Sequence, residues 1–326
     1  MGNIALGLNT LSNVRFADNQ ISSVYLGNNL VWSSYNYILD LYPTSVHHSY
    51  SLRKLRSAYG GFCLRVRRTA ITSTEVNVSF DSNNTISLNS PITYASGTAT
   101  TATTLGQFAA IAGYGTADIG VTANQNIFVV TWYDQSGNGK NITNATAARQ
   151  PRLVNSTTAD LEKSGGKVAV RFVKSDVNSL SLADTTANIN NMSSYFVGAF
   201  VGSTGNQVGY SLGATNRFYF PFYNGFVYAG YGTNATAILL DASFTTNRKL
   251  YELISPSTGS PTLAQGFTNG VAQGTVAIAS GANTVIQLGT IGTNYYDGHI
   301  QEVIGWQTNA DRANKETNIN QYWTIY

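Results

Sequence analysis

Short apolar runs separated by Gly, Asn, Ser and Thr recur along most of this chain. The runs are rich in β-branched and aromatic side chains, which favour strands. The predicted strands are residues 127–133, 168–173, 195–201, 217–223, 226–231, 237–240, 249–254, 276–278, 285–288 and 299–306. Many short strands with turn residues between them are typical of an all-β sandwich or jelly roll.

Residues 50–59 are predicted to form a short amphipathic helix. Leu52 and Leu55 recur at helical spacing, and Gly60 follows the run. Residues 62–68 then alternate apolar and basic side chains, which is the period-two pattern of a half-exposed strand. We interpret the basic side chains as a solvated face rather than an anion site.

Two further helices are expected. One short helix lies near residues 105–112, within a stretch rich in Ala, Thr and Gly. The other ends the chain, because Thr308 to Asp311 fit a capping box that satisfies the first backbone donors of a helix. Ile319, Tyr322 and Trp323 supply its inward face.

The first 33 residues form a distinct leader. Gly27-Asn28-Asn29 separates two apolar runs and predicts a β-hairpin. Because an isolated hairpin is marginally stable in water, we expect the leader to pack on another surface or chain. The candidate anchor positions are Val24, Tyr25, Leu26, Leu30 and Trp32. We therefore divide the chain into an anchor module, residues 1–33, and a sandwich domain, residues 34–326.

The composition narrows the function classes. Charged residues make up 11% of the chain, well below the usual quarter, and the net charge of +3 is too small for a nucleic-acid-binding stripe. No apolar run is long enough to span a bilayer, and the first residues lack the basic region of a secretory signal. We expect cytoplasmic synthesis without processing. The single cysteine, Cys63, excludes an intrachain disulfide and is expected to be a buried thiol.

Two passages, residues 48–68 and residues 130–141, together resemble the catalytic domain of B-type α-L-arabinofuranosidases of fungi and bacteria. The more specific one contains Tyr133, Asp134, Gln135, Ser136, Gly137, Asn138 and Gly139. A third passage, residues 296–306, resembles the closing strand of laminin-G and concanavalin-like domains. The resemblance implies a concanavalin A-like jelly-roll β-sandwich over about residues 42–326, with a short N-terminal β-unit before it and a terminal helix at its end.

The catalytic carboxylates of that family have no counterparts here. Retaining glycosidases need two carboxylates about 5 to 5.5 Å apart. The resemblance places the nucleophile near Tyr223, yet residues 185–240 contain no Asp or Glu. It places the acid near Asn294, and an amide cannot shuttle the proton. The family's vicinal cysteine pair is impossible with one cysteine. We expect no catalytic residues, with hydrolysis through Asp297 or Asp241 as the minor alternative.

No metal or cofactor is expected. The spacing of Asp134 and its neutral neighbours fails the EF-hand pattern, and Asn-Gly more often turns the chain. His47 and His48 are adjacent, with no Cys or acidic residue at ligand spacing, which disfavours zinc. A hydrolytic triad lacks the Gly-x-Ser-x-Gly signature.

Residues 218–231 are the most aromatic segment. Alternate tyrosines of a strand pair would present their rings on one surface, where sugars stack. The alternative is a sandwich core with tyrosine hydroxyls at its rim. The candidate glycan-binding residues are Tyr219, Tyr223, Asn224, Tyr228, Tyr231, Asn294, Tyr295 and Asp297.

The leader pattern Ile-x-x-Val-Tyr-Leu-Gly-Asn-x-Leu-Val-Trp resembles short N-terminal modules of phage structural proteins. We therefore predict a bacteriophage virion protein of the tail or capsid surface, catalytically inactive, whose lectin-like domain adheres to host or environmental glycans. Its expected partners are other virion proteins, cell-surface polysaccharide and copies of itself, but neither nucleic acid nor membrane. The alternatives are an arabinofuranosidase-like hydrolase and a capsid decoration protein that binds no glycan.

Overall fold

The computed structural model describes residues 37–69, 74–118, 120–186, 191–202, 205–213, 226–230, 237–242, 246–255, 262–278 and 285–326, and the backbone of strands within residues 15–33 and 218–223. Its α-helices are α1 (Ile38–Leu41), α2 (Leu105–Phe108) and α3 (Arg312–Trp323), and two 3-10 turns span Ala147–Arg149 and Lys174–Asp176. None of the helices in these ranges is long and apolar enough to cross a membrane.

Two antiparallel sheets make up the larger part of the fold. One has the order β24–β23–β22–β17–β28, and both β5 and β15 pair with the far side of β28. The other has the order β16–β25–β18–β19–β20–β21. Their bounds are β5 Val46–Ser51, β15 Val170–Phe172, β16 Leu180–Ala183, β17 Ser193–Phe200, β18 Gln207–Leu212, β19 Phe218–Tyr223, β20 Phe226–Gly230, β21 Ala237–Asp241, β22 Lys249–Ile254, β23 Thr262–Thr268, β24 Val271–Ile278, β25 Val285–Leu288 and β28 Gly298–Trp306.

The remaining strands extend the sandwich or form small hairpins. Five antiparallel strands have the order β8–β7–β6–β9–β11, and β10 and β12 pair with β9 and β11. Four hairpins are β1–β2, β3–β4, β13–β14 and β26–β27. Their bounds are β1 Arg15–Phe16, β2 Asn19–Gln20, β3 Ser23–Leu26, β4 Asn29–Ser33, β6 Leu64–Arg68, β7 Glu75–Val78, β8 Ile92–Ser96, β9 Ile127–Trp132, β10 Ile142–Thr143, β11 Arg152–Asn155, β12 Asp160–Leu161, β13 Lys163–Ser164, β14 Lys167–Val168, β26 Thr290–Ile291 and β27 Asn294–Tyr295.

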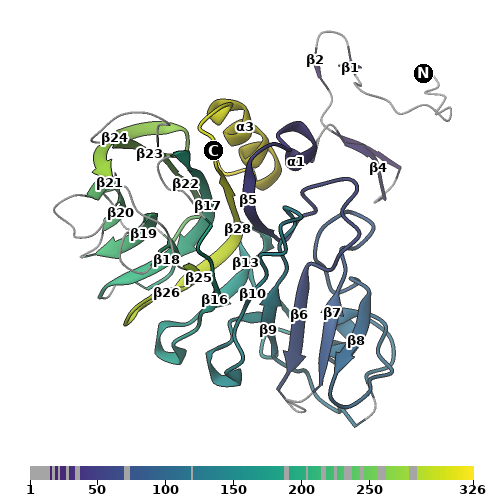
Figure 1. The fold of residues 1–326 in the computed structure, drawn as a ribbon. Helices are drawn as coiled ribbons and strands as arrows, with labels where there is room; N and C mark the ends of the chain where they lie inside the picture. The colour runs from purple at the N-terminus through teal and green to yellow at the C-terminus, as the bar shows by residue number, and fades with distance from the viewer. Residues whose placement is uncertain are drawn as a thin grey trace.

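An aromatic core holds the two large sheets together. Phe196 of β17 stacks on Phe220 of β19 at a ring-centroid distance of 5.7 Å, and Tyr251 of β22 and Tyr210 of β18 pack beside them. Figure 1 shows that β5, near the start of the chain, lies beside β28, near its end. The predicted all-β sandwich with a C-terminal helix is therefore confirmed.

The strand predictions hold, in two cases with the same bounds, residues 249–254 and 285–288. The predicted strand over residues 168–173 is interrupted at Ala169, and residues 276–278 are the end of the longer strand β24. The predicted leader hairpin is present as β3–β4, with Leu26 opposite Asn29. The side chains of the candidate anchor residues Val24, Tyr25, Leu26, Leu30 and Trp32 lie outside the described part of the chain.

The predicted helix over residues 50–59 is wrong. Strand β5 continues to Ser51, and the residues after it form a bend, an isolated bridge between Arg53 and Thr85, and a turn. The N–H of Leu52 donates to the carbonyl of Gln301 (3.2 Å), and the N–H of Leu55 donates to the side chain of Gln135 (2.8 Å). Because distant partners take these donors, no intrahelical ladder forms.

The basic side chains of β6 are not the solvated face that we expected. Arg68 is buried and lies 2.6 Å from Asp118, and Arg67 is buried and donates to Gln150 (2.5 Å). Arg65 alone among the three keeps about a third of its side chain exposed, at 35%. The strand itself is confirmed, but two of its cations serve packing.

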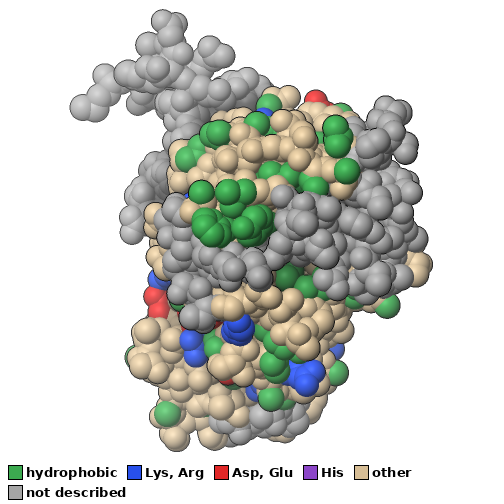
Figure 2. Space-filling view, turned by 90° about the vertical axis from the view of Figure 1, so that its left-hand side faces the viewer, with side chains coloured by type: hydrophobic (Ala, Val, Ile, Leu, Met, Phe, Trp, Pro, Cys, Tyr) green, Lys and Arg blue, Asp and Glu red, His purple; other side chains and the backbone are tan. Residues whose placement is uncertain are grey.

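The terminal helix begins at Arg312, without the predicted capping box. Asp311 has a left-handed φ of 59° and its side chain makes no cap, while the Thr308 hydroxyl accepts from the N–H of Ala310. Ile319 and Trp323 are fully buried, which confirms the inward face. Cys63 is also fully buried, as predicted. Figure 2 shows that few and scattered charged side chains lie among neutral ones on one face of the molecule.

Candidate functional site

Asp134, the most polar residue of the family-like motif, fixes a loop to strand β5. One carboxylate oxygen accepts from the backbone N–H groups of Ser49 (2.8 Å) and Ser136 (2.9 Å). The other accepts from the hydroxyl of Ser136 (2.6 Å) and the N–H of Lys140 (3.1 Å). Since hydrogen-bond donors surround the buried carboxylate, its chemistry is that of an anchor rather than of a nucleophile or a cation ligand.

The neighbouring motif residues also connect the loop to the chain around strand β5. Gln135 accepts from the N–H of Leu55 (2.8 Å) and donates to the carbonyl of Ser51 (3.0 Å). Asn138 donates to the carbonyl of Val46 (2.7 Å). The motif is thus a buried fastening between the β9–β10 loop and the chain around β5.

Three more motif residues shape the loop. The Tyr133 hydroxyl donates to Asn77 of β7 (2.7 Å). Gly137 and Gly139 have φ values of +92° and +69°, a conformation that glycine adopts without strain. The loop therefore depends on these glycines for its path.

A chain of buried polar groups lies beside this loop. His47 Nε2 is 3.1 Å from Asp184, and the Nδ1 atoms of His47 and His48 are 2.8 Å apart. His48 Nε2 is 2.9 Å from the hydroxyl of Tyr210, and the Lys140 ammonium is 2.9 Å from Asp184. Sequence reasoning found no acidic partner for the histidines, because Asp184 is far away in the chain.

Burial keeps both histidines neutral near pH 7. Burial and the Lys140 ammonium together lower the pKa of His47 to about 4, against the opposing effects of Asp184 and Asp134. Burial and the His47 ring hold the pKa of His48 well below its usual value. Burial alone would raise the pKa of Asp184, but hydrogen bonds from Thr186 and Lys140 outweigh it and lower the pKa to about 2. All three groups are almost completely buried, so this row of hydrogen-bonded polar groups is a structural feature rather than an open active site.

One pair of carboxylates shares a partner in the part of the chain that the structure describes. Arg312 Nη1 donates to Glu252 (3.0 Å) and to Glu316 (2.7 Å). Burial raises the pKa of Glu252 to about 8, although Arg312 opposes the shift. Glu252 is fully buried, and the guanidinium joins it to Glu316. A glycosidic bond cannot reach this pair.

The aromatic segment predicted to present tyrosines is the β19–β20 hairpin. Tyr219 lies opposite Gly230, and Tyr223 lies opposite Phe226. Phe220 is fully buried in the sandwich core, so part of the segment serves packing.

The common tyrosine surface stays a prediction. Tyr228 is partly exposed, and its ring contacts Phe226 at a centroid distance of 6.3 Å. The side chains of Tyr219 and Tyr223, and all of Asn224 and Tyr231, lie outside the described residues.

Asp297 directly precedes strand β28 and contacts Gln207 at the start of β18, near that hairpin. Its carboxylate pairs with Arg171 (2.5 Å), and its N–H donates to Gln207 (2.8 Å). Gln207 in turn lies opposite Phe222 of β19. Asn294 and Tyr295 form β27, which contacts β18 and is partly exposed. The structure thus places the candidate residues of the β19–β20 hairpin and the candidates Asn294 to Asp297 on or beside neighbouring strands. Asp297 is already paired with Arg171.

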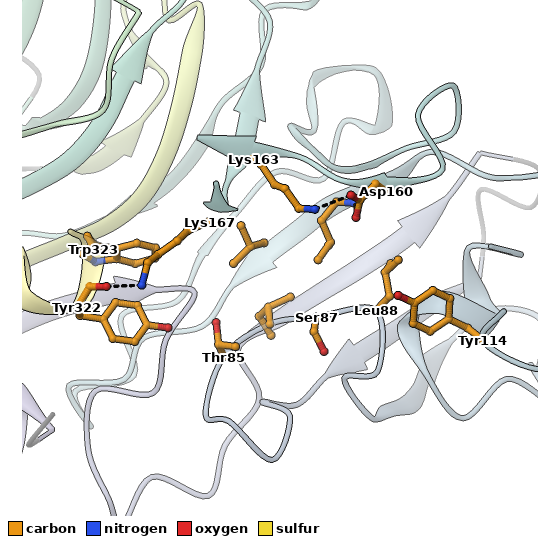
Figure 3. A pocket seen from close by; sticks show the side chains of 12 residues that line it. Thr85, Ser87, Leu88, Tyr114, Asp160, Lys163, Lys167, Tyr322 and Trp323 are labelled. Atoms are coloured by element: carbon orange, nitrogen blue, oxygen red, sulfur yellow. Dashed lines mark hydrogen bonds and ion pairs between the residues drawn. The ribbon is translucent and has the colours of Figure 1, made fainter. Parts of the chain in front are cut away.

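A pocket that sequence reasoning missed lies between the end of α3 and the β13–β14 hairpin (Figure 3). Its volume is about 370 Å³. We call it the α3 pocket. Its lining residues are Thr85, Ile86, Ser87, Leu88, Tyr114, Asp160, Leu161, Lys163, Lys167, Val168, Tyr322 and Trp323.

The α3 pocket has polar groups at both ends and apolar side chains between them. At one end the Lys167 ammonium donates to the carbonyl of Tyr322 and lies 4.5 Å from the centre of its ring. Tyr114 lies at the opposite end, with its hydroxyl toward the pocket (Figure 3). Lys163 pairs with Asp160 (2.5 Å) at the rim, where both side chains are more than 40% exposed.

Comparison with solved structures identifies the same fold in enzymes. A mutant α-L-arabinofuranosidase of glycoside hydrolase family 54, soaked with 4-nitrophenyl α-L-arabinofuranoside, is similar with a TM-score of 0.53 and 14% identity over 88% of this chain. A second family 54 arabinofuranosidase structure, soaked with a cyclic sulfate inhibitor, has a TM-score of 0.52 and 14% identity over the same share.

These likenesses establish the fold. The chain covers 63% of the length of both arabinofuranosidase chains. No protein-family model and no curated protein matches the sequence. The resemblance noted in the sequence is thus supported at the level of the sandwich fold.

Proposed function

We propose that this protein binds glycans without hydrolysing them, and that the α3 pocket is its sugar site. The observation that carries the proposal is the combination of apolar, hydroxyl and charged groups in one pocket of about 370 Å³. Pockets of 300 to 1,000 Å³ are typical of small-ligand sites.

The lining of the α3 pocket suits a sugar. Sugars have apolar C–H faces and hydroxyl groups around their edges. Ile86, Leu161 and Val168 offer apolar contact, while Thr85 and Tyr114 offer hydroxyls. Such a mixture of apolar surface with a few polar groups fixes the orientation of a ligand.

The same lining does not suit hydrolysis. Glycosidases flank the scissile bond with two carboxylates, about 5 to 5.5 Å apart in retaining enzymes and about 6.5 to 9.5 Å apart in inverting ones. Among the described lining residues Asp160 is the single carboxylate, and Lys163 pairs with it. This supports a binding protein over an arabinofuranosidase.

A glycan array followed by calorimetry with the best ligand tests this function. Tyr114→Ala should weaken binding about tenfold, because it removes the aromatic wall at one end of the pocket. Tyr94→Ala is the matched control, since Tyr94 is 46% exposed and lies outside the pocket lining. If Tyr228→Ala weakens binding and Tyr114→Ala does not, the site is the β19–β20 surface instead.

The fold shared with arabinofuranosidases makes hydrolysis the second function to test. The purified protein should release no product from aryl α-L-arabinofuranosides. Turnover that Asp297→Ala abolishes would overturn the non-catalytic proposal.

The virion role is a separate proposal. It is supported by the leader's resemblance to phage structural modules and by the low share of charged residues, 11%. Residues 1–33 would attach the protein to the tail or capsid surface. Particles assembled with a chain that lacks these residues should not contain it, whereas normal incorporation would refute the anchor.

A further inference from the structure

Two cations lie close together near the α3 pocket, the partly buried Lys167 and the buried Arg248. Lys167 lines the pocket, and the positive charge of Arg248 acts on it. Arg248 donates to the carbonyls of Ser164 (2.8 Å), Trp323 and Thr324 (3.1 Å), and Lys167 donates to that of Tyr322. Neither cation is among the ion pairs of the ranges that the structure describes.

Two buried arginines elsewhere in this chain are neutralised directly. Arg53 pairs with Glu302 at 2.7 Å, and Arg68 pairs with Asp118 at 2.6 Å. Of the two lysines that line the pocket, Lys163 pairs with Asp160, whereas Lys167 uses one N–H on a carbonyl and has two more to donate. Burial, and after it the charges of Arg248 and Arg53, lower the pKa of Lys167.

Two buried side chains hold the β13–β14 hairpin that presents Lys163 and Lys167. Gln301 of β28 donates to the carbonyls of Ser164 (3.2 Å), Lys167 (3.2 Å) and Val168 (2.9 Å). Arg248 supports the hairpin at Ser164, as described above. Because Gln301 is fully buried and Arg248 is 8% exposed, the backbone under the lysines is fixed before any ligand arrives.

We propose that the α3 pocket recognises a sugar that carries a carboxylate, a uronate residue of an acidic polysaccharide, with the carboxylate on Lys167. The inference rests on the proposed glycan-binding function and names its ligand class. The apolar residues Ile86, Leu161 and Val168 contact the ring of the sugar, and the free N–H groups of Lys167 meet its charge. Lys163, at the rim of the pocket, is already paired with Asp160.

The test compares a galacturonic acid tetramer with its fully methyl-esterified form by calorimetry, using the full-length protein. Both probes have the same length and hydroxyls, the ester adds one methyl group per residue, and only the acid carries charge. The acid should bind about tenfold more tightly, and the difference should shrink in high salt. Lys167→Met keeps the apolar stem and removes the ammonium, so it should abolish the preference and leave the ester unaffected.

Lys54→Met is the matched control, because Lys54 lies outside the pocket lining, and it should leave the preference unchanged. Thermal unfolding of each variant shows whether it is folded. Equal binding of acid and ester, or a preference that survives in Lys167→Met, would overturn the uronate inference while glycan binding stands. Absence of binding to both tetramers and to every glycan on the array would overturn the proposed function itself.

Discussion

At the scale of single residues, Asp134 carries the strongest structural prediction. Its buried carboxylate satisfies backbone donors from both β5 and its own loop. Asp134→Ala leaves these N–H groups buried without an acceptor, so the free energy of unfolding should fall by about 3 kcal/mol or more. Urea unfolding followed by tryptophan fluorescence measures the change.

Asp176→Ala provides the comparison for that measurement. Asp176 is exposed, so its removal should change the free energy of unfolding by less than about 0.5 kcal/mol. A loss for Asp134→Ala as small as that for Asp176→Ala would contradict the anchor role. Retained glycan binding in a folded Asp134 variant would agree with it.

The histidine pair predicts how stability depends on pH. His47 has a pKa of about 4 in the folded protein and about 6.5 when unfolded. The unfolded chain therefore binds the extra proton between these values, and stability falls as the pH drops from about 6.5 to 4. For His47 alone the loss is about 3 kcal/mol, measurable by urea unfolding at a series of pH values.

A variant series isolates this effect. Glu252, with a pKa of about 8, acts with the opposite sign: it stabilises the fold as the pH falls below that value. Its contribution cancels when variants are compared at each pH. His47→Gln should flatten the acid limb. If the acid limb has the same slope in His47→Gln and in the wild type, His47 is not the cause of the loss of stability in acid.

At the scale of elements, Arg248 closely approaches the turn of the β13–β14 hairpin, and substitutions in this turn test the contact. Gly165 and Gly166 both have left-handed φ values, +55° and +76°. A Cβ at Gly165 would lie 2.8 Å from the Arg248 guanidinium carbon, while a Cβ at Gly166 meets nothing within 4 Å. Gly166→Ala should therefore cost about 1 kcal/mol from backbone strain, and Gly165→Ala clearly more.

Thermal unfolding of the two variants measures the difference. Because both substitutions add one methyl group at a strained position, the excess loss in Gly165→Ala reports the contact with Arg248. Equal losses would mean that the guanidinium moves aside without cost. Since the hairpin carries Lys163 and Lys167, Gly165→Ala should also weaken binding in the α3 pocket.

The strands, the short helix near residue 105 and the C-terminal helix were largely predictable from the sequence, whereas the path of residues 50–59 was not. Segments such as residues 249–254 combine β-branched or aromatic residues with flanking turns, and local chemistry suffices to predict them. The error over residues 50–59 has a different origin. The helical spacing of Leu52 and Leu55 is real, but Gln301 and Gln135 take their backbone donors from far away in the sequence.

The candidate site was less predictable than the fold. Residues 85–88, Tyr114, the β13–β14 hairpin and the end of α3 line one pocket although they lie far apart in the chain. The sequence shows two signals, the Gly-Gly turn between Lys163 and Lys167 and the aromatic end of α3. Neither signal reveals that the two elements meet. The motif at Asp134 was recognised from sequence, but only its hydrogen bonds show that it fastens the loop.

At the scale of the whole molecule, the described core predicts which part of the chain folds alone. The buried hydrophobic cluster runs from Ile38 to Trp323 and includes side chains of both large sheets and of α3. A chain of residues 34–326 should therefore fold by itself, with a thermal midpoint within a few degrees of the full-length value. The same chain should keep its glycan binding, because every lining residue of the α3 pocket lies within it. Near-ultraviolet circular dichroism and calorimetry with the best glycan check both expectations. A molten or aggregated product would mean that the leader belongs to the domain, and an anchor role separate from the sandwich would then lose its physical basis.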